Sequence, residues 1–477
     1  MRPVSASHDF AVALSEAVSA YGDRPAFRSG DRVLTYSQLG AIVEDKSAAY
    51  DSAGIRRAST VGVIADDPAE FLTDVFALLK LQAFCVLLPA ETTHWELERL
   101  SGSVRLGHVL SAAPVDGRSV PVGDARVLAR LNGEHASIGR AACLGFLTSG
   151  TTGRSKIALR TEKAMLAEAA AMRHELGLTP GRRLAAMVPL HHSFGFGDCA
   201  LTGILAGAEV SSYPRMPPSA YLAAFERAAI EVVALVPPQL RLLAEASNAR
   251  VFDRLSVLSG GAPLNVGTAR LAEERLGCAL GQVYGTTETG IMTVAPPGEG
   301  SSGFVGKPSR HMEVRLKGPP TGWAAATPGA SGEGVVTVRS EALFEGYVTL
   351  DGIDARSVQT GWFATGDCAR WIDGRLELLG RLSSAINVAG VKVSAEEVEA
   401  ALLAFPGVRG ALVTGVDHAL TYQRIKAVVT PADVDVDALR RFCEERLSPS
   451  KRPHYYEAIA ALATTPSGKV IRATHRQ

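Results

Sequence analysis

Apolar residues along the chain alternate between helical spacing and short continuous runs. Phe10, Leu14 and Ala17 recur at the spacing of one helix face, whereas residues 60–65 form one apolar run typical of a buried strand. The alternation continues to residue 88 and resumes from 144 to about 295, and it predicts a mostly parallel sheet flanked by helices, in two α/β halves. The predicted strands are 26–28, 60–65, 85–88, 184–188, 209–213, 231–235 and 255–258, and the predicted helices are 10–20, 37–50, 68–81, 162–176, 197–206, 219–228 and 238–247.

Three stretches depart from this alternation. Between Ala112 and Arg140, Pro, Gly and Asp recur, and the pattern predicts only a weak strand or two. Residues 303–379 change to short strands and turns, which is typical of a small β-rich subdomain. From residue 380 a tail follows whose first helix begins with Ser394 and Glu397 in the spacing of a capping box.

The tail is expected to be a compact unit of its own. Its first helix ends near Phe405, and strands 408–415 and 425–430 and a helix 436–446 follow. The fold class is therefore α/β. A large N-terminal domain, 1–379, contains two α/β subdomains and the small β-rich subdomain. A small α+β C-terminal domain, 380–477, completes the chain.

Composition narrows the class of protein. The chain has 477 residues, with 49 Lys plus Arg and 49 Asp plus Glu, so no net charge favours nucleic acid or an anionic membrane as partner. Six scattered cysteines without metal-binding spacing indicate reduced thiols and a cytoplasmic protein. The first 21 residues carry Asp9 and Glu16 and are not expected to be a signal peptide. The most apolar stretch, 71–90, contains Asp74 and Lys80 and predicts a helix and strand rather than a membrane span.

A loop rich in glycine and hydroxyl groups follows the apolar strand that ends at Leu147. Its glycines let backbone N–H groups converge and its hydroxyls add donors, so it is suited to hold phosphate, with Lys156 adding a positive charge. It is not a Walker A loop, because Ser155 precedes the lysine and Ile157 follows it. Taken alone, the segment also fits a surface turn. The loop consists of Thr148, Ser149, Gly150, Thr151, Thr152, Gly153, Arg154, Ser155 and Lys156.

Five further motifs follow this loop in order. Residues 259–264 read Ser-Gly-Gly-Ala-Pro-Leu and 284–288 read Tyr-Gly-Thr-Thr-Glu. After them come Thr365-Gly366-Asp367, Gly380-Arg381 and Pro466-Ser467-Gly468-Lys469. In this order and at these separations the set resembles the acyl-adenylate-forming (ANL) superfamily, which includes acyl- and aryl-CoA ligases, peptide-synthetase adenylation domains and firefly luciferase. The resemblance covers nearly the whole chain.

The resemblance implies a role for each motif in binding ATP. The loop from Thr148 to Lys156 would hold the β- and γ-phosphates, Thr287 would bond the α-phosphate, and Glu288 would hold Mg²⁺ that bridges phosphate oxygens. Glu288 could instead be a solvated loop carboxylate, and Tyr284 an ordinary core tyrosine rather than a ring packed on adenine. The residues expected around adenine and ribose are Gly260, Gly261, Ala262, Pro263, Tyr284, Gly285, Thr286, Asp367 and Arg381, with Asp367 accepting from both ribose hydroxyls.

The resemblance also assigns the tail domain two tasks. Lys469 matches the family's adenylation lysine, which would bridge the incoming carboxylate and the α-phosphate. Rotation of the mobile tail domain would then bring Gly390 to the site, where a missing side chain lets a pantetheine arm pass. The chain departs from the family at the hinge, where Ser383 and Ser384 replace the usual Asp or Lys and a following acidic residue. Serine can still take up a hinge rotation, although its ease is in doubt.

The segment that resembles the family's acid pocket begins at His191 and His192, with His192 in the gating position. Two adjacent histidines rarely chelate one ion, and no third ligand is evident. Phe196, Asp198 and Gly261 would complete the pocket. A lone buried carboxylate is costly, so Asp198 would need a partner such as an amino or hydroxyl group on an aromatic acid. The alternative is that Asp198 faces outward or pairs with a nearby Arg.

These expectations describe an ATP-dependent ligase of the acid–thiol type. It would convert a small-molecule carboxylic acid into an acyl-AMP and then into a thioester with coenzyme A, using ATP and Mg²⁺. An alternative acceptor is an amine or the phosphopantetheine of a carrier protein. Since no carrier domain follows residue 477, such a carrier is expected to be a separate protein. A protein that only binds nucleotide is the remaining alternative, although it would have no need of Lys469.

Overall fold

The structure is a computed structural model that divides into two compact units. The first comprises Met1–Glu313 and Val338–Phe363, and the second comprises Val314–Thr337 and Ala364–Gln477. The boundary expected at residue 380 falls inside the second unit and stays a prediction. The structure describes residues 9–90, 92, 97, 100–101, 104, 106–112, 119–122, 126–130, 143–148, 156–247, 255–318, 332–381, 385–388, 391–418, 422–447 and 451–463.

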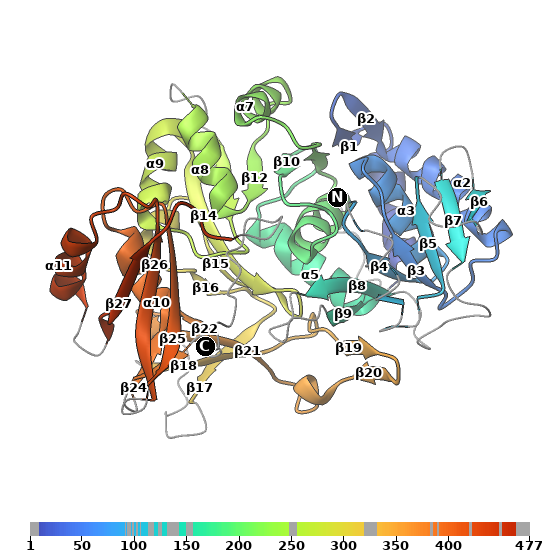
Figure 1. The fold of residues 1–477 in the computed structure, drawn as a ribbon. Helices are drawn as coiled ribbons and strands as arrows, with labels where there is room; N and C mark the ends of the chain where they lie inside the picture. The colour runs from blue at the N-terminus through green and yellow to red at the C-terminus, as the bar shows by residue number, and fades with distance from the viewer. Residues whose placement is uncertain are drawn as a thin grey trace. The chain divides into compact units, whose positions relative to one another are not determined.

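The first unit contains two nine-stranded sheets (Figure 1). In the first sheet, β1 and β10 to β14 form a parallel series, and antiparallel strands stand at both edges. Its order is β16-β15-β14-β13-β12-β10-β11-β1-β2. The strands are β1 (Pro25–Ser29), β2 (Arg32–Thr35), β10 (Arg183–Ala186), β11 (Glu209–Ser212), β12 (Val232–Leu235), β13 (Ser256–Ser259), β14 (Ala279–Thr286), β15 (Gly290–Ala295) and β16 (Lys307–Pro308).

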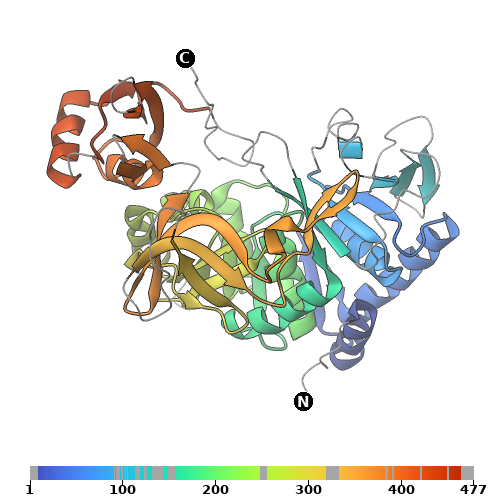
Figure 2. The same cartoon turned by 90° about the horizontal axis from the view of Figure 1, so that it is seen from below.

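The second sheet of this unit is parallel at its centre, where β5, β3, β4 and β8 are neighbours. Figure 2 shows the hairpin β19–β20 lying beside β9, which in turn pairs with β8. Its order is β20-β19-β9-β8-β4-β3-β5-β7-β6. The strands are β3 (Thr60–Val63), β4 (Phe84–Leu87), β5 (His108–Ser111), β6 (Ser119–Val122), β7 (Arg126–Arg130), β8 (Cys143–Thr148), β9 (Lys156–Thr161), β19 (Gly346–Thr349) and β20 (Gly352–Asp354).

Helices cover both faces of the first sheet. Apolar side chains of α8 and α9 pack on β12, β13 and β14, whereas α5 and α6 belong to the core cluster on the other face. The helices are α1 (Phe10–Tyr21), α2 (Tyr36–Ser52), α3 (Pro68–Lys80), α5 (Glu162–Glu175), the π-helix η1 (Phe194–Leu201), α6 (Thr202–Ala206), α7 (Pro218–Arg227), α8 (Pro237–Ala246) and α9 (Val266–Leu276), with 3₁₀ turns η2 (Gly300–Ser302) and η3 (Arg356–Val358). The predicted mixed α/β fold with parallel strands is confirmed.

The prediction of a single helix over 197–206 is wrong about where the helix begins and about the type of its first part. It begins at Phe194 as a π-helix and becomes an α-helix only at Thr202. The hydroxyl of Thr202 donates to the carbonyl oxygen of Gly197 at 2.7 Å inside this turn. A Cβ on Gly195 would lie 2.2 Å from the carbonyl oxygen of Pro189, so only glycine allows the approach of the two backbones. π-helical turns are rare and often occur at functional sites.

The second unit contains a four-stranded and a five-stranded sheet. The first has the order β17-β18-β21-β22, and in the second β24, β23, β26 and β25 follow one another while β27 pairs with β26. The expected helix 436–446 is confirmed, and the tail strands β23, β24 and β27 were not predicted. The elements are β17 (Glu313–Lys317), β18 (Gly332–Arg339), β21 (Phe363–Ile372), β22 (Arg375–Arg381), β23 (Ala385–Val388), β24 (Val391–Ser394), α10 (Ala395–Leu403), β25 (Gly410–His418), β26 (Tyr422–Thr430), α11 (Val436–Arg446) and β27 (Tyr455–Ala458).

Candidate active site

A tight turn joins β14 to β15 and carries two of the residues predicted to act on ATP. The N–H of Thr289 donates to the carbonyl oxygen of Thr286 at 3.1 Å. The Thr289 hydroxyl accepts from the Thr286 N–H at 3.1 Å and donates to the Gly290 carbonyl oxygen at 2.8 Å. Because Thr289 is fully buried and bonded in this way, it fixes the turn, and Thr287 and Glu288 remain half-buried on it.

Glu288 has a partner that sequence reasoning did not identify. The hydroxyl of Tyr347, on β19, donates to Glu288 Oε1 at 2.8 Å. The N–H of Phe344 donates to the Glu288 carbonyl oxygen at 2.8 Å, so the segment before β19 holds the backbone of the same residue. The Lys156 ammonium lies 4.8 Å from the centroid of the Tyr347 ring, a cation–π contact. The predicted phosphate-binding lysine and the predicted Mg²⁺-binding carboxylate therefore contact one tyrosine.

The chemistry of this group fits a magnesium ion shared with phosphate. An ionised carboxylate can accept several hydrogen bonds or metal contacts, so the bond from Tyr347 leaves Glu288 with further capacity. Mg²⁺ is commonly held by one or two carboxylates together with substrate phosphates. Within the described ranges, no group of three or more His, Cys, Asp and Glu side chains is arranged to hold a metal ion by protein ligands alone.

The phosphate loop is described only at its two ends. Thr148 ends β8, Lys156 begins β9, and the two residues are direct partners in the antiparallel register. Lys156 is exposed and Thr148 is half-buried. The remaining predicted loop residues lie outside the described residues: Ser149, Gly150, Thr151, Thr152, Gly153, Arg154 and Ser155.

The predicted adenine strip follows β13. Gly261, Ala262 and Pro263 are exposed, and Gly261 has a φ of +77°, which explains why glycine stands there. Gly260 is buried for a different reason. A Cβ at Gly260 would lie 2.5 Å from Val283 Cγ2 and 3.1 Å from Phe194 Cε1, so its missing side chain makes room for these protein groups.

The motif that follows the strip lies on β14. A Cβ at Gly285 would lie 2.2 Å from the carbonyl oxygen of Gly290, so this glycine is required by the close approach of β15. Thr286 forms the first residue of the tight turn. Tyr284 is 8 % exposed and pairs with Thr293 across the sheet. Its proposed contact with adenine stays a prediction.

The segment expected to line the acid pocket begins with two histidines before η1. The rings of His191 and His192 lie with centroids 4.3 Å apart, and His192 is exposed. Burial, together with the neighbouring His192, lowers the pKa of His191 to about 3. Phe194, the first residue of η1, is half-buried next to Gly260. His192 and Phe194 thus stand at the start of the π-helix, close to the predicted adenine strip.

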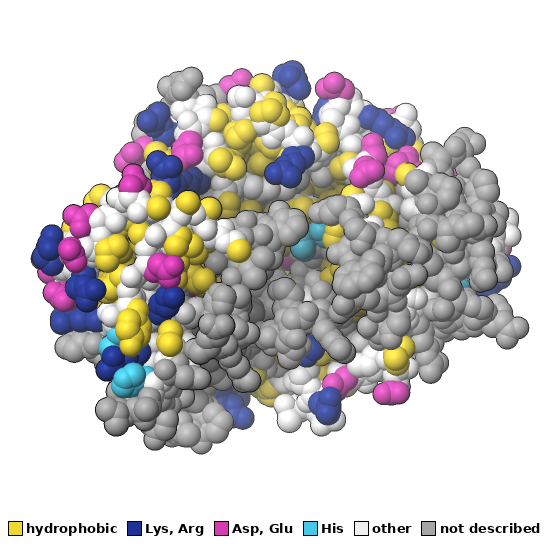
Figure 3. Space-filling model, viewed as in Figure 1, with side chains coloured by type: hydrophobic (Ala, Val, Ile, Leu, Met, Phe, Trp, Pro, Cys, Tyr) yellow, Lys and Arg dark blue, Asp and Glu magenta, His cyan; other side chains and the backbone are white. Residues whose placement is uncertain are grey.

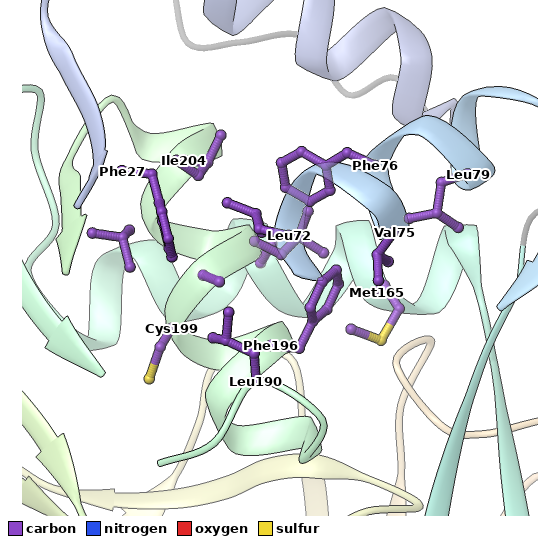
Figure 4. Close-up of a cluster of buried hydrophobic side chains, with 14 of the residues drawn as sticks. Phe27, Leu72, Val75, Phe76, Leu79, Met165, Leu190, Phe196, Cys199 and Ile204 are labelled. Carbon is purple, nitrogen blue, oxygen red and sulfur yellow. The ribbon is translucent and has the colours of Figure 1, made fainter. Parts of the chain in front are cut away.

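Phe196 occupies the hydrophobic core. Its side chain is fully buried and meets the Phe76 ring edge-on, with the two centroids 6.0 Å apart (Figure 4). Phe76 in turn packs on Phe10 of α1. This position anchors η1 on α3, and a role for Phe196 in lining the acid pocket stays a prediction.

Asp198 lies in a buried polar cluster rather than at the surface. It is 2 % exposed and forms a side-chain hydrogen bond with Glu168 of α5. Glu168 is paired with Arg160 of β9, with Glu168 Oε2 and Arg160 Nη2 3.0 Å apart. Asp198 therefore does not face outward, and its expected contact with a substrate stays a prediction.

Asp367 and Arg381, both predicted at the ribose, are direct partners across β21 and β22 of the second unit. Asp367 is 8 % exposed, and its N–H donates to the Thr365 hydroxyl at 3.0 Å. Gly366, which lies between Thr365 and Asp367, has a φ of +78°, which favours glycine. Lys469, Ser383 and Gly390 lie outside the described residues.

Sequence reasoning missed Tyr347, Arg160 and Glu168. Two signals were available in the pattern. Arg160 is a charged residue directly after the buried run Ile157–Leu159, and Glu168 lies on the buried side of its helix. Charged residues are almost never fully buried unless they are paired. The positions of Arg160 and Glu168 in apolar segments therefore indicated that each has a partner, but not which residue it is. For Tyr347 the sequence held no comparable signal.

The described surface carries charges of both signs. On the face seen in Figure 3, positive and negative side chains are interspersed with apolar ones over the described surface. Of the helices in the described part of the chain, none is long and apolar enough to cross a membrane.

Comparisons with known proteins cover almost the whole chain. A family model for AMP-binding enzymes matches residues 14–348, and one for the AMP-binding enzyme C-terminal domain matches 397–469. A feruloyl-CoA synthase of Amycolatopsis sp is 30% identical over 475 residues, covering 95% of each chain.

Two solved structures have similar folds. One is O-succinylbenzoate coenzyme A synthetase from Bacillus subtilis in complex with ATP and magnesium ion, with a TM-score of 0.81, 23% identity and coverage of 98% of this chain and 99% of that chain. The other is an amide bond synthetase from Marinactinospora thermotolerans, with a TM-score of 0.78, 25% identity and coverage of 96% and 97%.

Proposed function

The chain belongs to the AMP-binding enzyme family, and on this basis we propose that it is an ATP-dependent ligase that activates an aromatic carboxylic acid as an acyl-AMP and then forms a thioester with coenzyme A. The family membership confirms the resemblance found in the motifs. The observation that carries the proposal is the arrangement around Glu288. Thr287 and Glu288 were predicted from one motif and Lys156 from another, and Tyr347 links Lys156 to Glu288.

The first step requires a carboxylate to attack the α-phosphate of ATP, and pyrophosphate leaves. Negative charge on both partners opposes the attack, so the protein must offset this charge and align the two groups. In the proposal, Lys156 and the loop amides bind the β- and γ-phosphates, and the Thr287 hydroxyl donates to the α-phosphate. Glu288 holds the magnesium ion, which would offset charge on the phosphate oxygens.

Residues of the second unit are proposed to act on the ribose and on the reacting groups. Asp367 accepts hydrogen bonds from the ribose hydroxyls, which suits a carboxylate that only accepts, and Arg381 contacts the ribose. Lys469 donates to the incoming carboxylate and to the α-phosphate as negative charge develops between them. In the second step Ser383 acts as the hinge, and Gly390 leaves room for the pantetheine arm. The division of the chain at residue 380 belongs to this proposal.

An aromatic acid is supported by two observations. Phe194 is half-buried beside the adenine strip, where its ring can pack on another ring. The relative named for feruloyl-CoA synthesis acts on an aromatic acid. The expectation that the acid carries an amino or hydroxyl group assumed that Asp198 has no partner in the protein. This argument is weaker because Glu168 already bonds Asp198.

A second acceptor is favoured by one comparison. The similarity to an amide bond synthetase supports an amine as an alternative to coenzyme A, and a separate carrier protein is a third acceptor of the same activated acid. Pyrophosphate exchange driven by a panel of aromatic and aliphatic acids tests the first step. Coenzyme A, a phosphopantetheinyl carrier and an amine are then supplied in turn. The proposal requires exchange with an aromatic acid and a thioester product, and it is overturned if no acid drives exchange.

A further inference from the structure

Behind the turn between β14 and β15 lies a cluster of three buried charged residues from three elements. Arg160 of β9 and Glu168 of α5 are fully buried, and Asp198 of η1 is nearly so. Fully burying charged side chains is costly unless they are paired and hydrogen-bonded, so their presence needs an explanation beyond packing.

The cluster lies directly against the turn. Arg160 Nη2 bonds Glu168 Oε2 at 3.0 Å, and Arg160 Nη1 donates to the carbonyl oxygen of Thr287 at 3.4 Å. On the far side of the turn, the backbone of Ile291 acts to lower the pKa of the Asp198 carboxyl. The side chains of Thr287 and Glu288 are therefore carried by a segment that is bonded to this polar cluster through Arg160.

Two glycines make room for the cluster. A Cβ on Gly290, at the end of the turn, would lie 1.4 Å from Glu168 Oε1. A Cβ on Gly197, the residue before Asp198, would lie 3.2 Å from Glu168 Oε2 and 2.8 Å from Met165 Cε. The backbone of both the turn and the π-helix thus lies against the Glu168 carboxylate, and at Gly290 no side chain would permit this approach.

The charges of the cluster balance. Burial first, and the Glu168 charge second, raise the pKa of the Asp198 carboxyl well above its usual range, which favours the protonated form of Asp198 beside Glu168. The remaining pair, Arg160 and Glu168, is neutral overall. His311 also faces Arg160, whose charge adds to burial in lowering the pKa of His311 to about 4, so this histidine is neutral.

We propose that Arg160, Glu168 and Asp198 are positioning residues that fix the turn bearing Thr287 and Glu288 relative to the π-helix of the acid pocket. Arg160 is also on the strand that begins with Lys156, so the cluster connects the phosphate loop, the catalytic turn and the acid-pocket helix. The inference rests on the proposed function for the roles of Thr287 and Glu288, and it assigns Asp198 a protein partner rather than a substrate.

The test separates positioning from stability. The double variant Arg160→Met with Glu168→Met removes both charges together, so no unpaired charge is left in the interior and the fold is expected to survive. Arg160→Lys keeps a charge beside Glu168 but lacks the fork of donors that also reaches Thr287. For both variants we expect a thermal midpoint near that of the wild type, an unchanged KM for ATP and a kcat for pyrophosphate exchange lower by about tenfold or more.

A second readout does not depend on activity. Amide hydrogen exchange of residues 286–291 is expected to speed up in both variants, whereas α8 and α9 keep their protection. The control is Arg28→Met with Glu209→Met, which removes an ion pair of 2.8 Å in the same unit and should change neither kcat nor exchange at the turn.

The outcomes are distinguishable. Wild-type kcat together with wild-type exchange at residues 286–291 in both variants would overturn the positioning role, and so would an equal loss in the control. If the wild-type protein drives no pyrophosphate exchange with any acid, the proposed function fails, and hydrogen exchange at the turn still decides the inference.

Discussion

The hydroxyl of Tyr347 donates a hydrogen bond to the carboxylate of Glu288 across 2.8 Å. The bond joins the β19–β20 hairpin, at the edge of one sheet, to the turn after β14 in the other. The Lys156 ammonium lies over the same tyrosine ring. One side chain therefore orients both the ammonium of Lys156 and the carboxylate of Glu288, the two charged groups predicted to act at the phosphates. In the proposed function, Tyr347 would therefore support the magnesium-binding carboxylate from outside the set of direct ligands.

Replacing Tyr347 with Phe should weaken the use of magnesium. The ring remains for Lys156, but Glu288 loses the donor that orients its carboxylate, and losing such a partner costs about tenfold or more in metal affinity. We expect the Mg²⁺ concentration at half-maximal pyrophosphate exchange to rise about tenfold. Tyr221→Phe removes a hydroxyl that donates to Pro214 and serves as the control. If the Tyr347→Phe variant instead needed less Mg²⁺, the result would mean that the Tyr347 hydroxyl competes with the ion for Glu288.

Lys469→Ala should abolish most of the adenylation step. The lysine is expected to offset charge that develops as the carboxylate attacks, and removing one such donor costs about 100-fold or more in rate. Nucleotide affinity, measured by calorimetry, should stay within a few-fold. Lys426→Ala, which removes a surface lysine paired with Glu457, is the matched control. Near-normal pyrophosphate exchange in the Lys469 variant would contradict the assignment.

Local elements were largely predictable from the chain. The helix 436–446 coincides with α11, because Asp435 caps it and apolar residues recur at helical spacing. The strand–helix alternation gave the correct class of fold. The order of strands in the sheets did not follow from it. β1 pairs with β11, about 180 residues further on, and no local pattern encodes such a partner.

The residues of the candidate site were likewise predictable only where a local sequence motif contains them. Thr287 and Glu288 were found through a contiguous motif, whereas Tyr347 is 59 residues from Glu288 and carries no motif of its own. Asp198 was expected to need a partner if it were buried, and an outward-facing side chain was left open. Its partner, Glu168, comes from another helix, so the sequence left open whether a substrate or the protein would satisfy it.

Acid preference provides a direct test of Asp198. Since Glu168 already satisfies its proton, we expect Asp198→Asn to keep the wild-type order of preference among benzoate, aminobenzoates and hydroxybenzoates. The measurement is kcat/KM for each acid in pyrophosphate exchange. A selective loss for the amino- or hydroxy-substituted acids in this variant would support a direct contact between Asp198 and the substrate.

Stability should depend on pH through Glu162, the first residue of α5. Its carboxylate accepts from the N–H of Phe10 at the start of α1 and faces Asp9 and Arg57. Burial is the largest cause that raises the pKa of Glu162 from 4.5 to about 7, and Asp9 adds to it, while the Phe10 N–H and Arg57 act in the opposite direction. The folded protein therefore holds this proton more tightly than the unfolded chain does.

The sign of the effect follows from this difference. The stabilisation is fully present below about pH 4.5 and is lost as the pH rises through about 7, when the half-buried carboxyl must ionise beside Asp9. In Glu162→Gln, which has no proton to lose, the thermal midpoint should fall less between pH 5 and 8 than in the wild type. Glu226→Gln, at an exposed position on α7, should leave the wild-type slope intact. Equal slopes for wild type and Glu162→Gln would mean that Glu162 ionises in the folded protein as it does in the unfolded chain.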